Sequence, residues 1–245
     1  MKRDESNEAA GFGEAAGPGE SIGPGEAAWD ESEGRGSCLT SALHQRFETL
    51  CGWALNPGIS GGEENLPKGS WVPDHVLSCL RELRRSGHDR LVISACLLGI
   101  ACRYDGKSKP VAGIEALLER LDFEVVPICP EMLAELGVPR PPMSFRKGDG
   151  RAMLDGAAAL VDRNGRSCTE AMTNGAGRAE TMAREVDARW ALLKERSPSC
   201  GLHQVDVSGS LVEGRGVFAA LAMDHGWRCY SEEELERLIR DREVE

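Results

Sequence analysis

The chain has 245 residues and a formal net charge of −11, from 40 Asp and Glu against 29 Lys and Arg. This length allows one full-sized domain plus a smaller or disordered region. The acidic balance argues against nucleic acid or an anionic membrane surface as the main partner. No apolar run approaches the roughly 20 residues of a membrane span, and the opening MKRDESNEAA leads into no apolar signal stretch. We therefore expect a cytoplasmic protein.

The first 36 residues have low complexity, because GEAA starts at both Gly13 and Gly25, and GPGE starts at both Gly17 and Gly23. Glycine, proline and glutamate dominate the segment, and such a composition buries too little apolar surface to offset the entropy lost on ordering. We predict a disordered acidic tail over residues 1–36.

Residues 37–88 are predicted to form a helical extension whose role the sequence leaves open. Leu43, Phe47 and Leu50 have helical spacing. A second helix is predicted to begin at Asp74 and to end at Gly87. Its apolar face consists of Val76, Leu77, Leu80 and Leu83.

Short apolar strands alternate with helices in the rest of the chain. Strands are predicted over residues 91–95, 123–128, 190–193 and 227–230, and helices over 114–121, 169–187 and 216–225. Residues 157–162 followed by Asn164-Gly165 predict a hairpin with its turn, and Asn174-Gly175 is a candidate interruption of a helix. Ser231 with Glu234 forms a capping box that opens a last helix. The alternation predicts an α/β domain over 89–245, with a mainly parallel sheet flanked by helices in a Rossmann-like three-layer arrangement.

Three of the nine cysteines each follow the end of a predicted strand. Cys96 directly follows the 91–95 strand, Cys129 directly follows the 123–128 strand, and Cys200 follows the 190–193 strand after a short loop. A single cysteine is more often a small buried hydrophobe than a ligand. Ligands of open α/β sheets, however, bind outside the carboxyl ends of the strands. We therefore expect these three thiols to converge on one rim of the sheet.

Turn-forming residues bracket each of these cysteines, in CLLG, CPE and SPSCG. Such loops expose the thiol and nearby N–H groups, which support thiolate metal sites. Three thiolates fit a zinc ion with one open position, or an iron–sulfur cubane with one iron free to bind substrate. The spacing alone leaves both alternatives open.

Several motifs occur in order between Leu91 and Tyr230: SACLLG with CRYDGKSKP, then VPICPE, PRPP and LKERSPSCG. Together they resemble the thiouracil desulfidase family, long catalogued as a bacterial domain of unknown function. The resemblance implies that Cys96, Cys129 and Cys200 hold a [4Fe-4S] cluster whose fourth iron binds the substrate sulfur. It also implies replacement of the thiocarbonyl sulfur of 2-thiouracil by oxygen, which gives uracil and sulfide.

The resemblance assigns catalytic roles to two further residues. Glu131 of the CPE motif is expected to act as general base, and Ser197 of the SPSC motif to hydrogen-bond the substrate or the developing oxyanion. Each has a plainer alternative, since Glu131 could only cap the following helix and Ser197 could only hold the Pro198 turn. The implied partner is a small thiolated base, with no nucleic acid and no membrane. The exact substrate and the oligomeric state are left open.

Several other polar residues allow two interpretations each. Cys102, Arg140 and His203 could line the pocket or serve only packing and loop structure, and the same holds for residues 103–105. The chain departs from the family pattern after Gly201 and after the CPE motif, both beside the expected pocket. Three alternative functions remain: a different enzyme on the same scaffold, a non-catalytic iron–sulfur or thiol sensor, and a zinc-dependent enzyme.

Overall fold

The computed structural model describes residues 38–55 and 72–244 of the chain. Its contacts divide the chain into Met1–Arg35 and Gly36–Glu245, and all described residues belong to the second unit. The tail predicted over residues 1–36 lies outside the described residues, so its disorder stays a prediction from composition.

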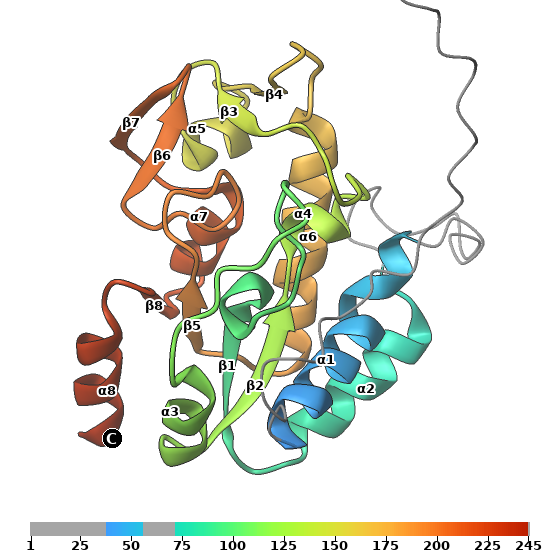
Figure 1. Ribbon diagram of the computed structural model, residues 1–245, viewed down its shortest axis with the longest axis vertical. Helices are drawn as coiled ribbons and strands as arrows, with labels where there is room; N and C mark the ends of the chain where they lie inside the picture. The colour runs from blue at the N-terminus through green and yellow to red at the C-terminus, as the bar shows by residue number, and fades with distance from the viewer. Residues whose placement is uncertain (1–37, 56–71, 245) are drawn as a thin grey trace, which may run out of the picture. The chain divides into compact units, whose positions relative to one another are not determined.

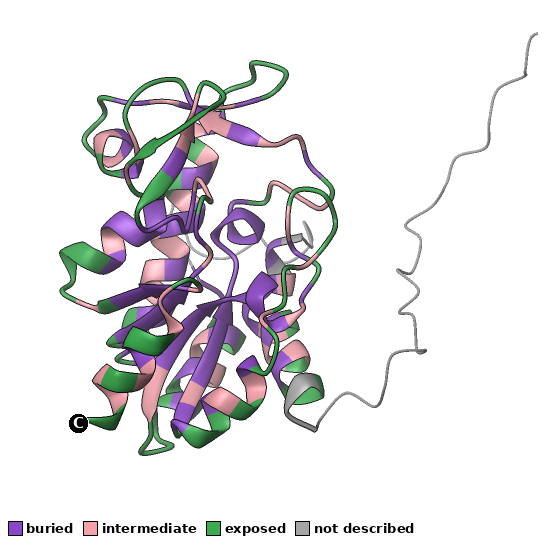
Figure 2. Ribbon diagram, turned by 60° about the vertical axis from the view of Figure 1, so that its left-hand side comes forward, coloured by how far each residue is buried: buried purple, intermediate pink, exposed green. Residues whose placement is uncertain are grey.

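A parallel sheet, sheet A, forms the centre of this unit (Figure 1). Its strands are β1 (Asp89–Ser94), β2 (Phe123–Ile128), β5 (Trp190–Leu193) and β8 (Arg228–Ser231), in the order β2-β1-β5-β8. All three neighbouring pairs are parallel. The strands are short apolar runs because both faces of a parallel sheet are covered, and Figure 2 shows them as buried. The predicted α/β fold with a mainly parallel sheet is therefore confirmed.

Helices cover both faces of sheet A. They are α3 (Ile114–Arg120), α6 (Thr169–Glu185), α7 (Val217–Asp224) and α8 (Leu235–Glu243), with the short η2 (Ala95–Leu98) directly after β1. In Figure 1, α3 lies in front of the strands and α6 behind them. The candidate interruption at Asn174-Gly175 is wrong, because α6 runs through both residues without a break. Its buried face includes Met172, Ala176 and Ala179, so packing outweighs the weak helix propensity of Asn and Gly.

The predicted helical extension consists of α1 (Cys38–Cys51), η1 (Gly52–Leu55) and α2 (Asp74–Arg84). Leu43, Phe47 and Leu50 are buried, as their spacing predicts, and they join the same apolar core as the strands of sheet A. The helix α2 contacts both α1 and α6. The extension therefore shares the core of the α/β unit and has no separate one.

A second sheet, sheet B, is absent from the sequence-based prediction. It contains β3 (Met143–Phe145), β4 (Leu160–Asp162), β6 (Gln204–Val207) and β7 (Ser210–Glu213), in the order β4-β3-β6-β7. Two short helices, α4 (Pro130–Leu133) and α5 (Gly150–Leu154), precede its first two strands. The turn at Asn164-Gly165 does form. Among the described residues, the two arms beside it are paired by one isolated bridge, between Val161 and Ser167. The strands β5 and β8 of sheet A are equally short but nearly all buried, whereas β6 has one buried residue and every residue of β7 is exposed, so neither forms an apolar run in the sequence.

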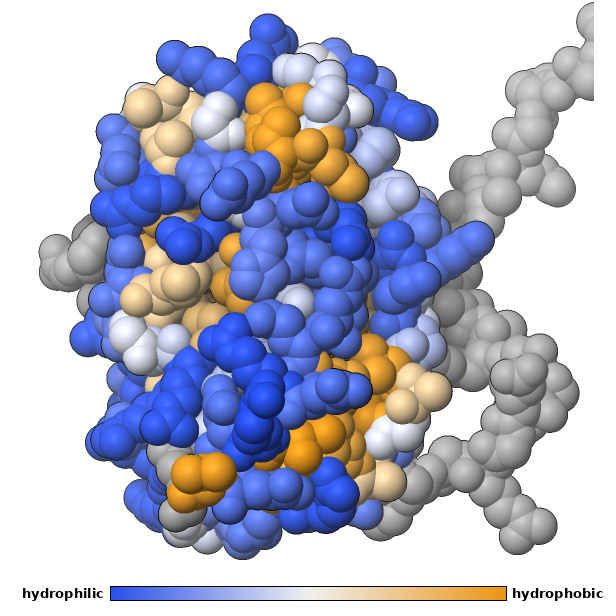
Figure 3. Space-filling view, turned by 90° about the vertical axis from the view of Figure 1, so that its left-hand side faces the viewer, coloured by the Kyte–Doolittle hydropathy of each residue, from blue (hydrophilic) through white to orange (hydrophobic). Residues whose placement is uncertain are grey.

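The surface of the molecule is mostly hydrophilic on the face that Figure 3 presents, with separate apolar patches. Exposed apolar side chains include Leu211 and Val212, both on β7. Within the part of the chain that the structure describes, no helix combines the length and apolar character needed to cross a membrane.

Candidate active site

The chain order of sheet A reverses between β1 and β5. After β1 the chain passes through α3 to β2 on one side, and after β5 it passes through α7 to β8 on the other. In open α/β sheets such a reversal opens a crevice at the carboxyl ends of the two strands. Ser94, the last residue of β1, accepts a 3.0 Å hydrogen bond from the backbone N–H of Lys194, which directly follows β5. This bond holds the two strand ends together at the crevice.

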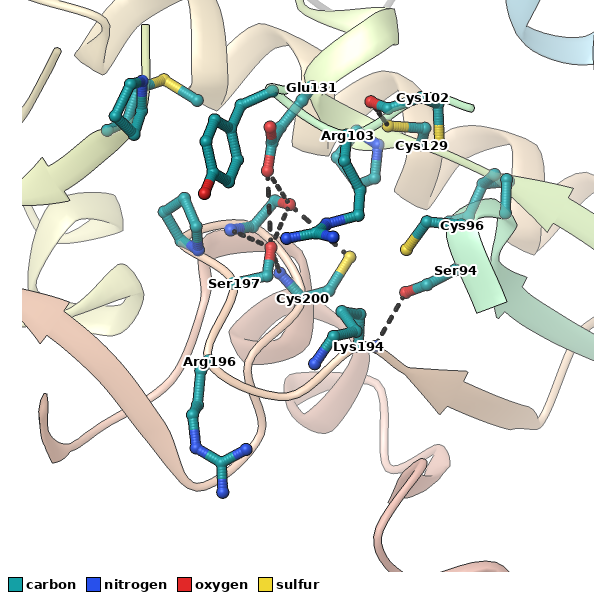
Figure 4. Close-up of a pocket in the computed structure, with 18 of the residues that line it drawn as sticks. Ser94, Cys96, Cys102, Arg103, Cys129, Glu131, Lys194, Arg196, Ser197 and Cys200 are labelled. Atoms are coloured by element: carbon teal, nitrogen blue, oxygen red, sulfur yellow. Dashed lines mark hydrogen bonds between the residues drawn. The ribbon is translucent and has the colours of Figure 1, made fainter. Parts of the chain in front are cut away.

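The three thiols that the sequence places after three different strands lie around one cavity at this rim. Cys96 lies in η2, Cys129 joins β2 to α4, and Cys200 follows β5 after the loop 194–199. All three line a cavity of about 300 Å³ (Figure 4), and none is more than 9% exposed. Within residues 38–55 and 72–244, no three His, Cys, Asp or Glu side chains lie close enough together to hold a single metal ion. The thiols surround a space and do not converge on one point.

A fourth thiol, that of Cys102, lines the same cavity. Hydrogen bonds between its side chain and the sulfurs of Cys129 and Cys96, together with burial, raise the pKa of Cys102 well above its ordinary value. The same contact with Cys102 lowers the pKa of Cys129, and the charge of Arg140 acts in the same direction. Cys129 therefore ionises first, while Cys102 keeps its proton and donates it as a hydrogen bond.

The loop that carries Cys200 is held by serine hydroxyls. The Ser197 Oγ accepts hydrogen bonds from the backbone N–H groups of Ser199 and Cys200, both at 3.2 Å. The Ser199 Oγ lies 3.6 Å from the Cys200 Sγ. Burial raises the pKa of the Cys200 thiol above its ordinary value, and the hydroxyls of Ser94 and Ser199 partly oppose that shift. Ser197 thus holds its turn, as its plainer interpretation predicts, and its side chain also faces the cavity (Figure 4).

The two oxygens of the Glu131 carboxylate have different hydrogen-bond partners. Its Oε1 lies 3.1 Å from the Ser199 Oγ and 3.4 Å from the Ser197 Oγ. Its Oε2 accepts a 2.9 Å hydrogen bond from Arg140 Nε and a second bond from Arg140 Nη2. The Glu131 side chain is 11% exposed and that of Arg140 is 4% exposed, so this is a buried ion pair. These partners lie in the cavity wall, so the side chain of Glu131 does more than cap α4.

Arg140 connects three segments of the site. Besides its ion pair, its Nη1 donates to the Gly137 carbonyl at 2.7 Å and its Nη2 to the Cys102 carbonyl at 3.1 Å. Its own backbone N–H donates to the Tyr104 carbonyl at 2.8 Å. Since every guanidinium nitrogen has an acceptor, the side chain fixes the orientation of Glu131 relative to the loop that carries Cys102.

The structure also decides which of the remaining polar residues face this cavity. Arg103 and Tyr104 line it, whereas His203 does not. The His203 side chain is 55% exposed and its Nε2 lies 2.9 Å from Glu234 Oε2. Ser199 is a site residue that the sequence-based reasoning missed. The available signal was the second serine of the SPSC motif, directly before Cys200.

Comparisons with known proteins agree with this geometry. A family model described as 2-thiouracil desulfurase matches residues 91–234. The uncharacterized protein YbbK of Bacillus subtilis (strain 168) is 36% identical over 152 residues, which are 61% of this chain and 99% of YbbK. A solved structure of the [4Fe-4S]-dependent thiouracil desulfidase TudS has a TM-score of 0.55 and 32% identity over 64% of this chain and 99% of TudS. The family match begins at Leu91, after α1, η1 and α2.

Proposed function

Because the chain belongs to the 2-thiouracil desulfurase family, we propose that it is an iron–sulfur-dependent desulfidase. The proposed reaction replaces the thiocarbonyl sulfur of a thiolated pyrimidine, such as 2-thiouracil, with oxygen and releases sulfide. The family and the similar structure support an enzyme that acts on a small thiolated base. The thiols at the site are free, and free thiols persist in a reducing compartment, which supports a cytoplasmic location.

We assign Cys96, Cys129 and Cys200 as the ligands of a [4Fe-4S] cluster. Thiolates are the ligands that such clusters take from proteins, and these three side chains reach one cavity from three different strands. Buried hydroxyl and thiol groups hydrogen-bond their sulfurs, which is the outer support that thiolate sites use. With three protein ligands, a bound cluster would supply a Lewis-acidic iron suited to a soft thiocarbonyl sulfur.

Glu131 is the general base in this proposal. Arg140 holds Oε2, and Oε1 lies beside the hydroxyls of Ser197 and Ser199 in the cavity wall. Oε1 takes a proton from a water molecule while that water adds to the thiocarbonyl carbon. The C–O bond forms and the thiocarbonyl electrons move to the sulfur. As the C–S bond breaks, the remaining proton of the added hydroxyl passes to the sulfur, which leaves as hydrosulfide, and Glu131 then returns its own proton to solvent. The Ser197 hydroxyl, beside Oε1, hydrogen-bonds the oxygen that is being added to the substrate. The balance of the reaction involves no oxidant and no reductant.

One observation carries the proposal: a buried carboxylate lies in the wall of the cavity that the cysteines line, with one oxygen held by an arginine and the other beside two serines. Burying such a carboxylate requires compensating hydrogen bonds. A protein that only binds or senses a cluster needs no carboxylate and serines at this position. The geometry therefore favours a catalyst over a sensor.

The role of Glu131 is tested by Glu131→Gln, which keeps the size of the side chain and removes its charge. We expect sulfide release from 2-thiouracil to fall by about 10²–10⁴-fold, with iron content per folded chain unchanged. The control is Glu135→Gln, whose half-exposed carboxylate pairs with Arg178 at 2.7 Å, and which we expect to retain full activity. Wild-type turnover in Glu131→Gln contradicts the assignment.

The cofactor is tested separately, by anaerobic purification, metal analysis and an absorbance spectrum. We expect a coloured protein with about four iron and four sulfide ions per chain. A colourless wild-type protein that contains zinc favours the alternative zinc-dependent enzyme. A coloured protein that turns over no thiolated base favours the alternative non-catalytic sensor.

A further inference from the structure

The helical extension lies against the elements that carry two of the proposed ligands. The helix α1 packs along β2 and also contacts η2, which contains Cys96. The short η1 contacts α4, which begins directly after Cys129. The segment β2–Cys129–α4 therefore rests on α1 and η1. This support lies outside residues 91–234, the part of the chain that matches the family.

The contact closest to the site is made by Cys51, the last residue of α1. Its side chain is fully buried, and its Sγ lies 4.0 Å from the Pro127 carbonyl oxygen of β2. Cys51 thus contacts the backbone of β2 one residue before the strand ends, at the point where the chain leaves the sheet for Cys129 and the cavity.

Polar contacts fix the position of α1 along β2. Arg46 forms an ion pair with Glu124 at 2.6 Å and donates to the Val125 carbonyl at 2.5 Å. The Arg46 and Glu124 side chains are only 24% and 17% exposed, so this pair is partly shielded from water. Because α1 cannot slide along the strand without breaking these contacts, the Cys51 sulfur stays beside the Pro127 carbonyl, two residues before Cys129.

We propose that Cys51 is a positioning residue for Cys129, and that the extension supports the ligand-bearing segment of the site. The buried Cys51 thiol fills the space beside the end of β2 and donates to the Pro127 carbonyl, so it fixes the backbone from which Cys129 reaches the cavity. Removal of the thiol leaves a void and a carbonyl without this donor, so the end of β2 gains freedom to move. The inference rests on the proposed function in one respect, since it takes Cys129 to be a cluster ligand.

The test compares Cys51→Ala with Leu43→Ala, a truncation of another buried residue of α1, eight positions or about 12 Å earlier along the helix. Hydrogen exchange of the peptide 127–133 is measured by mass spectrometry in metal-free protein. We expect this exchange to rise at least tenfold in Cys51→Ala relative to Leu43→Ala, even where Leu43→Ala lowers the melting temperature more. Cys51→Ser retains a hydrogen-bond donor at the same position and should restore most of the protection.

Cluster stability provides the second measurement. In reconstituted protein, transfer of iron to a chelator should be several-fold faster in Cys51→Ala than in Leu43→Ala, with Cys51→Ser close to wild type. Equal exchange of peptide 127–133 in Cys51→Ala and Leu43→Ala overturns the inference. A wild-type chain that binds no cluster overturns the proposed function instead, and the exchange measurement still decides whether Cys51 positions Cys129.

Discussion

At the scale of single residues, the ion pair between Glu131 and Arg140 controls the site. Both side chains are nearly inaccessible to water, so each charge depends on the other for compensation. The pair also orients the carboxylate, because Arg140 holds one oxygen and leaves the other toward Ser197 and Ser199. A substitution in this ion pair should therefore change both the stability of the protein and its catalytic rate.

Arg140→Gln should destabilise the protein by about 3–5 kcal/mol, since it leaves the Glu131 charge buried and unpaired. The double variant Arg140→Gln with Glu131→Gln should recover part of that loss, because both charges are then gone. Urea denaturation of the metal-free single and double variants measures both effects. Independent, additive losses in the double variant would show that the two side chains are not coupled.

A second prediction at this scale follows from the different pKa values of the cavity thiols. The lowered pKa of Cys129 and the raised pKa of Cys200 mean that, in metal-free protein near pH 8, Cys129 holds more thiolate. Thiolate is the reactive form, so iodoacetamide should modify Cys129 before Cys200. Cys102→Ala removes the hydrogen-bond donor and should move the pH profile of Cys129 to higher pH. Mass spectrometry of the alkylated peptides gives both rates, and faster modification of Cys200 contradicts the assignment.

At the scale of elements, the close crossing of α4 and α6 positions the helix that carries Glu131. A Cβ atom at Gly175 of α6 would lie 2.3 Å from the Pro130 carbonyl oxygen and 2.6 Å from the Ala134 Cβ. These distances are far below van der Waals contact, so only glycine allows the two helices to approach this closely. Gly175, which in the sequence suggests a helix interruption, is therefore required by the close packing of α4 against α6.

Gly175→Ala should therefore destabilise the protein, although replacement of glycine by alanine inside a helix usually stabilises it by about 1 kcal/mol. It should also slow sulfide release, because α4 must move and carries Glu131 with it. The neighbouring Asn174→Ala is the control, and its higher helix propensity should leave stability equal or slightly raised. Thermal denaturation and initial rates of the two variants decide the matter, and a more stable Gly175→Ala protein would disprove the close packing.

At the scale of the whole molecule, one apolar core joins the extension, sheet A and sheet B. The sequence predicts a domain boundary after residue 88, yet α1 packs on β2 and α2 packs on α6, both of which lie after it. The buried Leu, Phe and Val side chains that the structure describes before residue 88 belong to the same core as those elements. They are Leu43, Phe47, Leu50, Val72, Val76, Leu80 and Leu83. Each buried side chain of this size contributes about 1.5–3 kcal/mol, and the net stability of a domain is only about 5–15 kcal/mol.

Two truncations test this boundary. Removal of residues 1–36 should leave the melting temperature and the activity unchanged, since the described core begins after that point. Removal of residues 1–88 should yield insoluble or molten protein, because it uncovers the apolar surface under α1 and α2. Solubility and thermal unfolding of both products give the answer. A folded, active 89–245 fragment would instead support the boundary as the sequence predicts it.

The sequence by itself determined the parallel strands and the three cysteines that follow them. Apolar runs such as Phe123–Ile128 and turn formers such as Pro130 act on neighbouring residues, so a local pattern is enough to reveal them. The motifs around Cys96, Cys129 and Cys200 added the family resemblance, which the comparison with residues 91–234 confirms.

Only the tertiary structure decided the partners of these residues. The serines beside Glu131 come from 66 and 68 positions away, and Cys51 contacts a strand residue 76 positions away. The strands β6 and β7 of sheet B have one buried residue between them, so no apolar run marks them in the sequence. Contacts of this kind depend on how the chain folds back on itself, and a sequence records neither the crossing of two helices nor the direction of a buried side chain. The positions of the thiols are therefore a local property of the chain, whereas the environment that gives them their chemistry is a property of the fold.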